Sequence, residues 1–312
     1  MIKELTQEPI PGIQIGHEQD DRARTGCTVV LCEDGAVAGF DLRGSAPGTR
    51  ETELLRPGFL VEEIHGILLT GGSAFGLDAA GGVQKYLEER GKGFDSRGIR
   101  IPIVPAGVIF DLHIGYSRIR PNKEMAYRAC EKSRQDMVEC GVVGAGTGAT
   151  VGKIAGMENA MSGGVGYASE KLSSGLIVSS LAVVNALGDV IDIDTHEIIA
   201  GAKNPATEGF LNTSEFIRRE QVQAPLGPEN TTLAVVMTNA KLNKMEINKV
   251  AQMAQNGLAR VIRPAHTMFD GDLVFSLSCG ELNSDVNLIG DMAAATLSQA
   301  IITAVKISNG IE

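Results

Sequence analysis

Residues 229–244, ENTTLAVVMTNAKLNK, decide the fold of this 312-residue chain. Within them the continuous apolar run 233–237 predicts a central strand that is buried on both faces. The preceding stretch, 201–230, is polar, contains three prolines and follows no sustained period, which predicts an exposed loop of about thirty residues. Loops of that length are uncommon in a compact domain unless they are functional or disordered. The chain therefore passes from a long loop directly into a buried strand at Asn230-Thr231.

The segments around this strand predict both strands and helices. Asn243, followed by Glu246 three positions later, is typical of a capping box that opens an amphipathic helix. The expected helices start at Ser73, Asn122, Asn243 and Ser284, the first two ending near residues 90 and 140. The expected strands are 27–32, 36–40, 67–70, 101–104, 108–112, 176–184, 190–193, 233–237 and 273–277.

The order of these elements indicates the fold class. Asp34-Gly35 between the first two expected strands is a hairpin signature. Strands come in pairs and helices in blocks, rather than in strict βαβ alternation. This order favours a layered α+β sandwich over a doubly wound parallel sheet.

Composition excludes several classes of partner. The chain has 28 Lys and Arg against 38 Asp and Glu, a net charge of -10, and an acidic chain without basic runs argues against nucleic acid. The N-terminus lacks the apolar core of a signal peptide, and the most apolar windows, 176–187 and 293–305, are shorter than the ~18 to 20 residues of a spanning helix. The five cysteines form no CxxC pair, as is typical of reduced thiols. We expect a cytoplasmic protein that binds neither nucleic acid nor membrane.

Candidate metal and nucleotide ligands form no strong pattern. The five histidines show no HxxxH or HExxH spacing, so we expect no metal site and no cofactor. Gly144, Gly146 and Ala149 fit the GxGxxG/A dinucleotide motif, but the segment after them lacks the apolar stripe of a helix. A turn or strand with close backbone approach is the favoured interpretation, and a dinucleotide site is the alternative.

The loop-to-strand junction suggests a specific chemistry. If the peptide bond between Asn230 and Thr231 is cut, the free α-amine of Thr231 lies within reach of its own hydroxyl and can act as its general base. The same hydroxyl can make the cut by attacking the preceding carbonyl, which gives an ester that water resolves. Such a site needs no histidine. The alternative is that Asn-Thr-Thr reflects only turn chemistry and β-propensity.

Five further motifs accompany the 229–244 segment: LLTGGSAFGLDAAGGV, VPAGVIFDL, GAGTGATVGK, VVNALGDVID and HTMFDGDLVFSLS. In order and spacing they resemble the self-processing L-aminopeptidase/D-esterase family of N-terminal nucleophile hydrolases, which includes β-peptidyl aminopeptidases and nylon-oligomer (6-aminohexanoate-oligomer) endohydrolases. The resemblance implies a four-layer αββα sandwich, with residues 1–312 as a single hydrolase domain. It also implies autocleavage into an α chain, 1–230, and a β chain, 231–312, and a homo-oligomer of processed heterodimers, with a tetramer as the expected size.

The resemblance also implies the site residues. The family's nucleophile corresponds to Thr231, with cleavage after Asn230. Asn185 of the VNA motif would donate to the oxyanion, the alternative being a turn residue between two strands. Lys153 of the GATVGK motif would lower the pKa of the new amine, the alternative being a solvated surface lysine. Phe110 is expected to lie at the substrate. Some family members have a tyrosine near this position that assists the oxyanion hole, and Phe110 has no hydroxyl. A second oxyanion donor must therefore be a backbone N–H, or the oxyanion hole is weaker.

The acidic pair of the FDGD motif corresponds to Asp270 and Asp272. Two positions apart on a strand, their side chains would share a face and both point at Thr231. They would orient the amine and hydroxyl or, Asp270 in particular, bind the ammonium group of a substrate. The alternative is an Asp-Gly-Asp turn. The aminopeptidase/D-esterase branch tends to have Ser and Glu here, so the pair predicts closer similarity to the nylon-oligomer hydrolases.

Together these features predict a threonine-dependent amidohydrolase or peptidase that works through an acyl-enzyme on short amine-bearing peptides or amides. An acyltransferase on the same scaffold is one alternative, because an acyl-enzyme can pass its group to an amine instead of water. An uncleaved, non-catalytic small-molecule-binding protein is the other.

Overall fold

The computed structural model describes residues 7–219 and 230–311. Its strands are β1 Gln14–Asp20, β2 Thr25–Leu42, β3 Thr49–Arg50, β4 Glu63–Thr70, β5 Phe94–Ser96, β6 Ile99–Ile101, β7 Ala106–Val108, β8 Thr150–Val151, β9 Met161–Ser162, β10 Gly164–Lys171, β11 Ile177–Asn185, β12 Asp189–Ile191, β13 Ile198–Ala200, β14 Thr231–Ala240, β15 Ile262–Arg263 and β16 Leu273–Leu282. Its α-helices are α1 Ala80–Glu88, α2 Lys123–Glu131, α3 Thr213–Arg218, α4 Lys244–Val261 and α5 Val286–Asn309. Short 3-10 turns are η1 Glu53–Leu55, η2 Ser73–Ala79, η3 Gly144–Gly146 and η4 Met157–Asn159.

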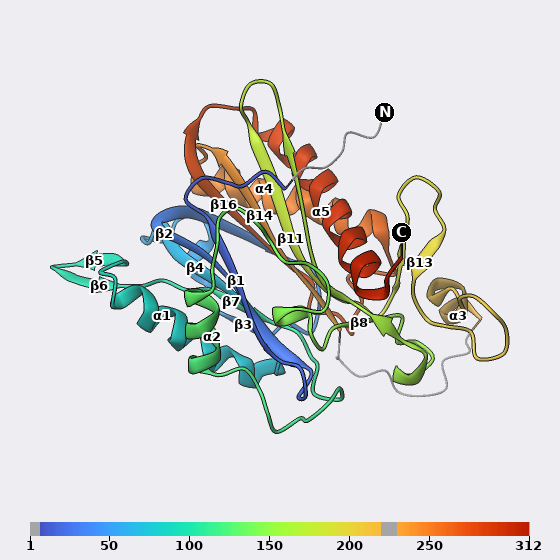
Figure 1. Ribbon diagram of the computed structural model, residues 1–312. Coiled ribbons are helices and arrows are strands. Elements are labelled where there is room, and N and C mark those ends of the chain that lie inside the picture. The colour runs from blue at the N-terminus through green and yellow to red at the C-terminus, as the bar shows by residue number, and fades with distance from the viewer. Residues whose placement is uncertain (1–6, 220–229, 312) are drawn as a thin grey trace.

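One long sheet carries the fold, in the order β10-β11-β14-β16-β2-β4-β7-β3, with β1 also paired to β2 (Figure 1). Strand β2 belongs to both halves, because its C-terminal part pairs with β16 and its N-terminal part pairs with β4 and β1. Helices α4 and α5 pack on the outer face of one half, and α1 and α2 pack on the outer face of the other. A third apolar cluster fills the space between the inner faces of the two halves. These four layers confirm the predicted α+β sandwich.

Strand β14 is the predicted central strand, and its neighbours explain its apolar run. Leu233, Val235 and Met237 point into the cluster between the sheet halves. Ala234 and Val236 point to the other face, into the cluster beneath α4 and α5. Because both faces of the strand are covered, every position from 231 to 238 is buried. The strand pairs antiparallel with β11 and parallel with β16, so its first residue lies between the ends of two other strands.

Two predictions about the N-terminal half are wrong. The expected hairpin at Asp34-Gly35 is absent, and 27–40 lies within the single strand β2. Strand β4 pairs with both parts of β2. The register of this pairing shifts between Leu31 and Ala36, and this irregularity contains Gly35. The helix expected from Ser73 begins as a 3-10 turn with Gly72 in the left-handed conformation, and α1 starts only at residue 80.

The helix boundaries agree better with the sequence. Asn243 and Glu246 form the predicted capping box of α4. Asn122 caps α2, which ends at residue 131 rather than near 140. The last helix begins one position later than expected, because Asp285 rather than Ser284 caps it. The strands predicted at 101–104 and 108–112 both start two residues earlier, as β6 and β7, and Pro102 and Pro105 limit them since proline lacks a ladder donor.

The segment predicted as a structureless loop, 201–230, contains the short helix α3, whose N-cap is Asn212. Residues 220–229 of that prediction lie outside the described residues. Buried Asp189 ties the described part to the body by accepting hydrogen bonds from Ala202 N at 3.0 Å and Thr213 N at 2.6 Å. The described residues of this segment are therefore anchored to the body at Ala202 and Thr213.

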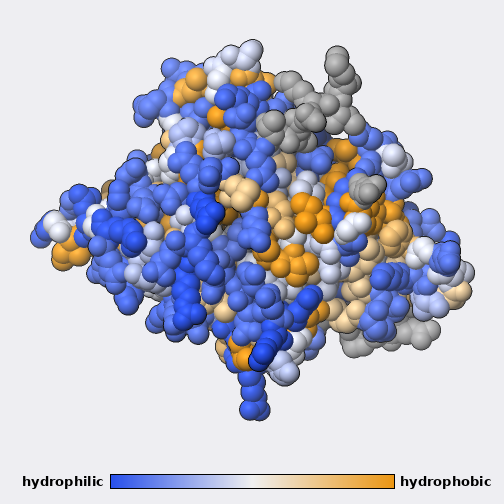
Figure 2. All heavy atoms as spheres, in the orientation of Figure 1, coloured by the Kyte–Doolittle hydropathy of each residue, from blue (hydrophilic) through white to orange (hydrophobic). Residues whose placement is uncertain are grey.

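Helix α5 is the one helix in residues 7–219 and 230–311 that is long and apolar enough to cross a membrane. In its most apolar window, 72% of the residues are buried inside the protein, as in a core helix. Figure 2 shows hydrophilic residues over α1 and α2 and more hydrophobic residues towards α5 and β13. The five cysteines are free thiols, three of them buried.

Candidate active site

The structure brings Asn185 and Thr231 together across the β11–β14 ladder. They are direct partners in the antiparallel register, although 46 positions separate them in sequence (231 minus 185). Asn185 is fully buried and Thr231 is 4% exposed. Asn185 is therefore the last residue of a strand, which excludes the alternative that it is a turn residue between two strands.

Lys153 lies against Asn185 and fixes its amide. The Lys153 ammonium donates to Asn185 Oδ1 at 2.7 Å and to the Asn185 backbone oxygen at 3.3 Å. Thr150 N donates to the same Oδ1 at 3.1 Å. Since two donors occupy the oxygen, the amide nitrogen is turned away and donates to the Phe110 carbonyl at 3.2 Å. Lys153 is 9% exposed, so it is not a solvated surface residue.

Phe110 borders this side of the site through its carbonyl and its ring. The ring lies 5.0 Å from that of His113, measured between centroids. Both residues line a small hollow with Lys153 and Met157. This hollow is the described cavity that adjoins the Lys153–Asn185 pair.

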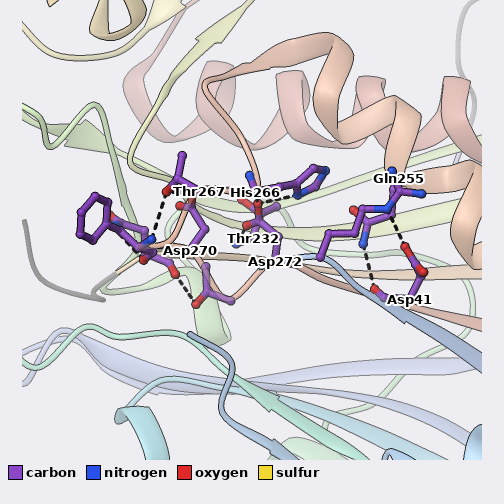
Figure 3. A network of polar contacts seen from close by, with 11 residues as sticks. Asp41, Thr232, Gln255, His266, Thr267, Asp270 and Asp272 are labelled. Atoms are coloured by element: carbon purple, nitrogen blue, oxygen red, sulfur yellow. Dashed lines mark hydrogen bonds and ion pairs between the residues drawn. The ribbon is translucent and has the colours of Figure 1, made fainter. Parts of the chain in front are cut away.

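The other side of Thr231 is formed by the segment 266–272. Figure 3 shows both predicted aspartates of this segment. The Asp270 carboxylate accepts from Thr267 N at 2.8 Å and Thr267 Oγ1 at 2.5 Å. The Asp272 carboxylate accepts from Thr232 N at 2.8 Å through one oxygen. Its second oxygen contacts His266 N at 2.9 Å and His266 Nδ1 at 3.0 Å.

The predicted placement of the aspartates on one strand face is wrong. Both residues precede β16, and Asp270 forms an isolated parallel bridge with Asn230. Their carboxylates bond to Thr267, Thr232 and His266, whereas the Thr231 hydroxyl bonds to the Asn230 carbonyl. An Asp-Gly-Asp turn is not present either, because the turn lies at residues 268–269, Asp270 is in the bridge, and Gly271 and Asp272 are irregular. Each aspartate is only 2% exposed. Burial and the nearby charge of Asp272 raise the pKa of Asp270 to about 6.

The bond predicted to be cut is held tightly. The Asn230 carbonyl oxygen accepts from Thr231 Oγ1 at 2.5 Å and from Gly271 N at 2.8 Å. Asn230 N and Nδ2 both donate to the Phe269 carbonyl, at 3.3 and 3.2 Å. The hydroxyl and the carbonyl on which it would act are therefore already in contact.

Sequence reasoning did not single out His266, Thr267 or Gly271. Histidine spacing indicates only possible zinc ligands, whereas His266 contacts a carboxylate from a left-handed backbone conformation with φ of 57°. The available signal was the HTMFDGD stretch, which contains all three residues. In the described part of the chain, no group of three His, Cys, Asp or Glu side chains is arranged to hold a metal ion.

The glycine-rich segment is a tight turn, as favoured, rather than the start of a helix. Gly144–Gly146 forms a 3-10 turn that lies against β2 at Thr28. A Cβ on Gly144 would lie 2.5 Å from Thr28 Oγ1, and one on Gly152 would lie 2.0 Å from Ala202 N. Close backbone approach therefore explains these glycines.

Comparisons with known proteins show the family of this chain. The model of peptidase family S58 matches residues 8–310. An uncharacterised aminopeptidase of Mycobacterium leprae (strain TN) is 39% identical over 339 residues, covering 97% of this chain and 90% of the relative. A 6-aminohexanoate-oligomer endohydrolase of Kocuria sp. (strain KY2) is 27% identical over 321 residues, covering 97% and 87%.

Solved structures show the same fold. A β-aminopeptidase of Burkholderia sp. superposes with a TM-score of 0.67 at 21% identity, covering 97% of this chain and 88% of that one. The L-aminopeptidase D-Ala-esterase/amidase of Ochrobactrum anthropi is described as a variant of the Ntn hydrolase fold. It superposes with a TM-score of 0.69 at 14% identity, covering 96% of this chain and 88% of that one.

The aspartate pair predicted closer similarity to the nylon-oligomer hydrolases, yet identity to the mycobacterial aminopeptidase exceeds identity to the endohydrolase. Both groups of relatives are named for the hydrolysis of peptide or amide bonds. With its Ntn-type fold and a family match over nearly its whole length, this chain is an amide or peptide hydrolase that belongs to peptidase family S58.

Proposed function

We propose that this hydrolase processes itself at Asn230-Thr231 and then uses Thr231 as an N-terminal nucleophile. The observation that carries the proposal is the position of the Thr231 hydroxyl. It lies 2.5 Å from the oxygen of the preceding carbonyl and beside Asn185 in the ladder. One hydroxyl thus contacts the bond to be cut and adjoins a buried amide donor.

After the cut, the Thr231 α-amine takes the proton from its own hydroxyl, which attacks the substrate carbonyl and forms an acyl-enzyme. Asn185 stabilises the oxyanion, and one such donor contributes roughly 3 to 4 kcal/mol to the transition state. The α-amine passes this proton to the departing amine of the substrate. It then takes a proton from an attacking water and returns it to Thr231 Oγ as the acyl group leaves as a carboxylic acid.

The two flanking groups have separate tasks. Lys153 holds Asn185 in orientation, and its positive charge lowers the pKa of the nearby amine so that this amine stays neutral as a base. Asp272 positions the start of β14 through Thr232 N. Asp270, with Phe110 across the site, receives the amine-bearing end of the substrate, because a buried carboxylate attracts an ammonium group.

We infer that the substrates are short amine-bearing amides, namely peptides, amino-acid amides or ω-amino-acid oligomers. The names of the relatives, an aminopeptidase, a β-aminopeptidase and a 6-aminohexanoate-oligomer endohydrolase, support this range. The active form in this proposal is a cytoplasmic homo-oligomer, a tetramer, of processed heterodimers.

Intact-mass spectrometry tests the proposal. The wild-type chain should give fragments of 230 and 82 residues (312 minus 230), and Thr231→Ala should abolish both processing and amidase activity. Thr232→Val is the matched control, because the buried Thr232 hydroxyl has no hydrogen-bond partner in the described residues, and it should be processed normally.

Other outcomes identify the alternatives. An uncut chain that hydrolyses amides contradicts the proposal, and an uncut chain that only binds ligand indicates a binding protein. Transfer of the acyl group to an added amine in preference to water indicates an acyltransferase.

A further inference from the structure

We propose that the active centre uses two different oxyanion donors for its two acyl transfers. The backbone N–H of Gly271 serves self-cleavage, and Asn185 serves the hydrolysis of substrates. The inference rests on the proposed self-processing at Asn230-Thr231 and adds the group that makes the cut possible.

The first observation is the contact on the scissile carbonyl. Gly271 N donates to the Asn230 oxygen at 2.8 Å, within the range of about 2.7 to 3.1 Å that oxyanion donors occupy. The nucleophilic Thr231 hydroxyl contacts the same oxygen. As negative charge develops on this oxygen, the Gly271 N–H is in place to stabilise it.

The second observation is that the donor is held in a fixed direction. The Asp270 C=O and the Gly271 N–H belong to one peptide group and point in opposite directions. Ala46 N donates to the Asp270 oxygen at 2.9 Å, and Arg43 N and Gly44 N donate to the Asp272 oxygen at 3.1 and 3.2 Å. The strap of residues 43–46 therefore aims the Gly271 N–H at the Asn230 carbonyl.

The third observation is the space at position 271. A Cβ there would lie 2.7 Å from Thr231 Oγ1 and 2.7 Å from the Ala46 oxygen. Any side chain would push either the nucleophile or the strap away. Glycine is required here for close approach, because it lets a backbone donor and the nucleophile share one carbonyl.

Asn185 is engaged elsewhere in the uncut chain. It lies on the β11 edge of β14, whereas Gly271 precedes β16 on the opposite edge. The Asn185 amide nitrogen donates to the Phe110 carbonyl, and its oxygen receives Thr150 N and Lys153. The Asn230 carbonyl is directed to the Gly271 edge. The two donors are thus on opposite sides of the nucleophile.

The cleavage step balances with one water. Thr231 Oγ bonds to the Asn230 carbonyl carbon, and the C=O electron pair moves onto the oxygen that faces Gly271 N. The C–N bond then breaks, and the hydroxyl proton ends on the departing Thr231 nitrogen, leaving an ester and a free amine. Water hydrolyses the ester to the Asn230 carboxylic acid and the Thr231 hydroxyl.

Replacing Gly271 by glycolic acid, through nonsense suppression in cell-free translation, replaces this N–H by an ester oxygen. It also makes the Asp270 carbonyl a weaker acceptor for Ala46 N, an effect that the strap variants below measure separately. We expect conversion of the full chain into its two fragments to slow by about 10²- to 10³-fold. Intact-mass spectrometry over time measures this rate. The same replacement at exposed Gly58, which has open space around it, is the control for a backbone ester and should be processed at the wild-type rate.

A conventional pair of variants tests the strap. Ala46→Pro removes the N–H that holds the Asp270 carbonyl and should slow processing, whereas Ala46→Gly keeps that N–H and should not.

Asn185→Ala should show the opposite pattern to the chain with the ester at position 271, with a large loss of amide hydrolysis and a small loss of self-processing. Its hydrolysis of an added amide should fall by about 10²- to 10³-fold, while its processing falls less than tenfold.

The inference is overturned if the chain with the ester at position 271 is processed at the wild-type rate. It is also overturned if Asn185→Ala loses self-processing as completely as it loses amide hydrolysis. Thermal unfolding of each variant, compared with its control, shows whether a loss reflects misfolding. Failure of the proposed function has a different signature: an uncut wild-type chain, cleavage that persists in Thr231→Ala, or an α fragment lighter by one water, which indicates attack by the Asn230 side chain.

Discussion

The two sides of Thr231 are built on different physical principles. On the β11 side, strand register places Asn185, and the Lys153 ammonium orients its amide through a hydrogen bond. On the β16 side, an irregular turn holds two buried carboxylates, a histidine and a backbone donor through side-chain-to-backbone bonds. The second side responds to pH, because the pKa of Asp270 is raised to about 6 by burial and the charge of Asp272. A single nucleophile is thus served by one rigid and one titratable wall.

The largest expected effect tests the titratable wall through Asp270. Its pKa in the folded state is about 6, against the ordinary value of 3.8, so between these values the folded state keeps a proton that the unfolded chain has lost. This contribution to stability is complete below pH 4 and is lost as pH rises through 6, by roughly 3 kcal/mol. Urea unfolding of the uncut Thr231→Ala chain should show this loss.

Adding Asp270→Asn to the Thr231→Ala chain should remove this pH-dependent contribution to the free energy of unfolding. The amide oxygen can still accept from Thr267, and it does not ionise. The double variant should therefore lose roughly 3 kcal/mol less than Thr231→Ala alone between pH 4 and 8. Parallel stability curves for the two chains would contradict the assignment.

The rigid wall is tested by Lys153→Met, which keeps an unbranched side chain, one heavy atom shorter, and removes the charge. Without its charged donor the Asn185 amide is free to reorient, and kcat/KM for an amino-acid amide should fall by about 100-fold. Lys171→Met is the control, because Lys171 forms an exposed pair with Glu8 far from the site. A change below threefold in Lys153→Met would show that this wall does not depend on the cation.

A smaller effect is expected for Asp272→Asn. The carboxylate accepts from Thr232 on one oxygen and from His266 on the other, whereas an amide offers one acceptor and leaves a donor facing a donor. The free energy of unfolding should fall by about 2 kcal/mol. Asp192→Asn, in an exposed turn with two backbone donors on one oxygen, should cost far less. Equal losses in both variants would argue against a special role for the buried carboxylate.

The smallest effect concerns His266. Asparagine tolerates the left-handed conformation of this position, so His266→Asn removes the ring contact with Asp272 without backbone strain. We expect a stability loss of about 1 kcal/mol and a decrease in kcat/KM of less than tenfold. His196→Asn, another histidine with positive φ but exposed, should leave both quantities unchanged. If His266→Asn abolishes activity, the ring takes part in proton transfer itself.

The sequence by itself determined the features that depend on neighbours along the chain. The capping box at Asn243 and Glu246 and the apolar run 233–237 were predicted correctly, because capping is local and burial on both faces leaves a continuous apolar pattern. The same local reasoning failed at Asp34-Gly35, where pairing of β2 with the distant strand β4 overrides a turn signal.

Only the tertiary structure decided how the site is assembled. The resemblance to a family supplied the identities of Thr231, Asn185 and Lys153, but the ladder register and the burial of the lysine come from contacts between remote segments. The HTMFDGD stretch marks the position of His266 and Gly271 but not their roles, because a backbone N–H and an isolated histidine carry no pattern. Their function arises from a turn geometry that packing against residues 43–46 and the start of β14 imposes.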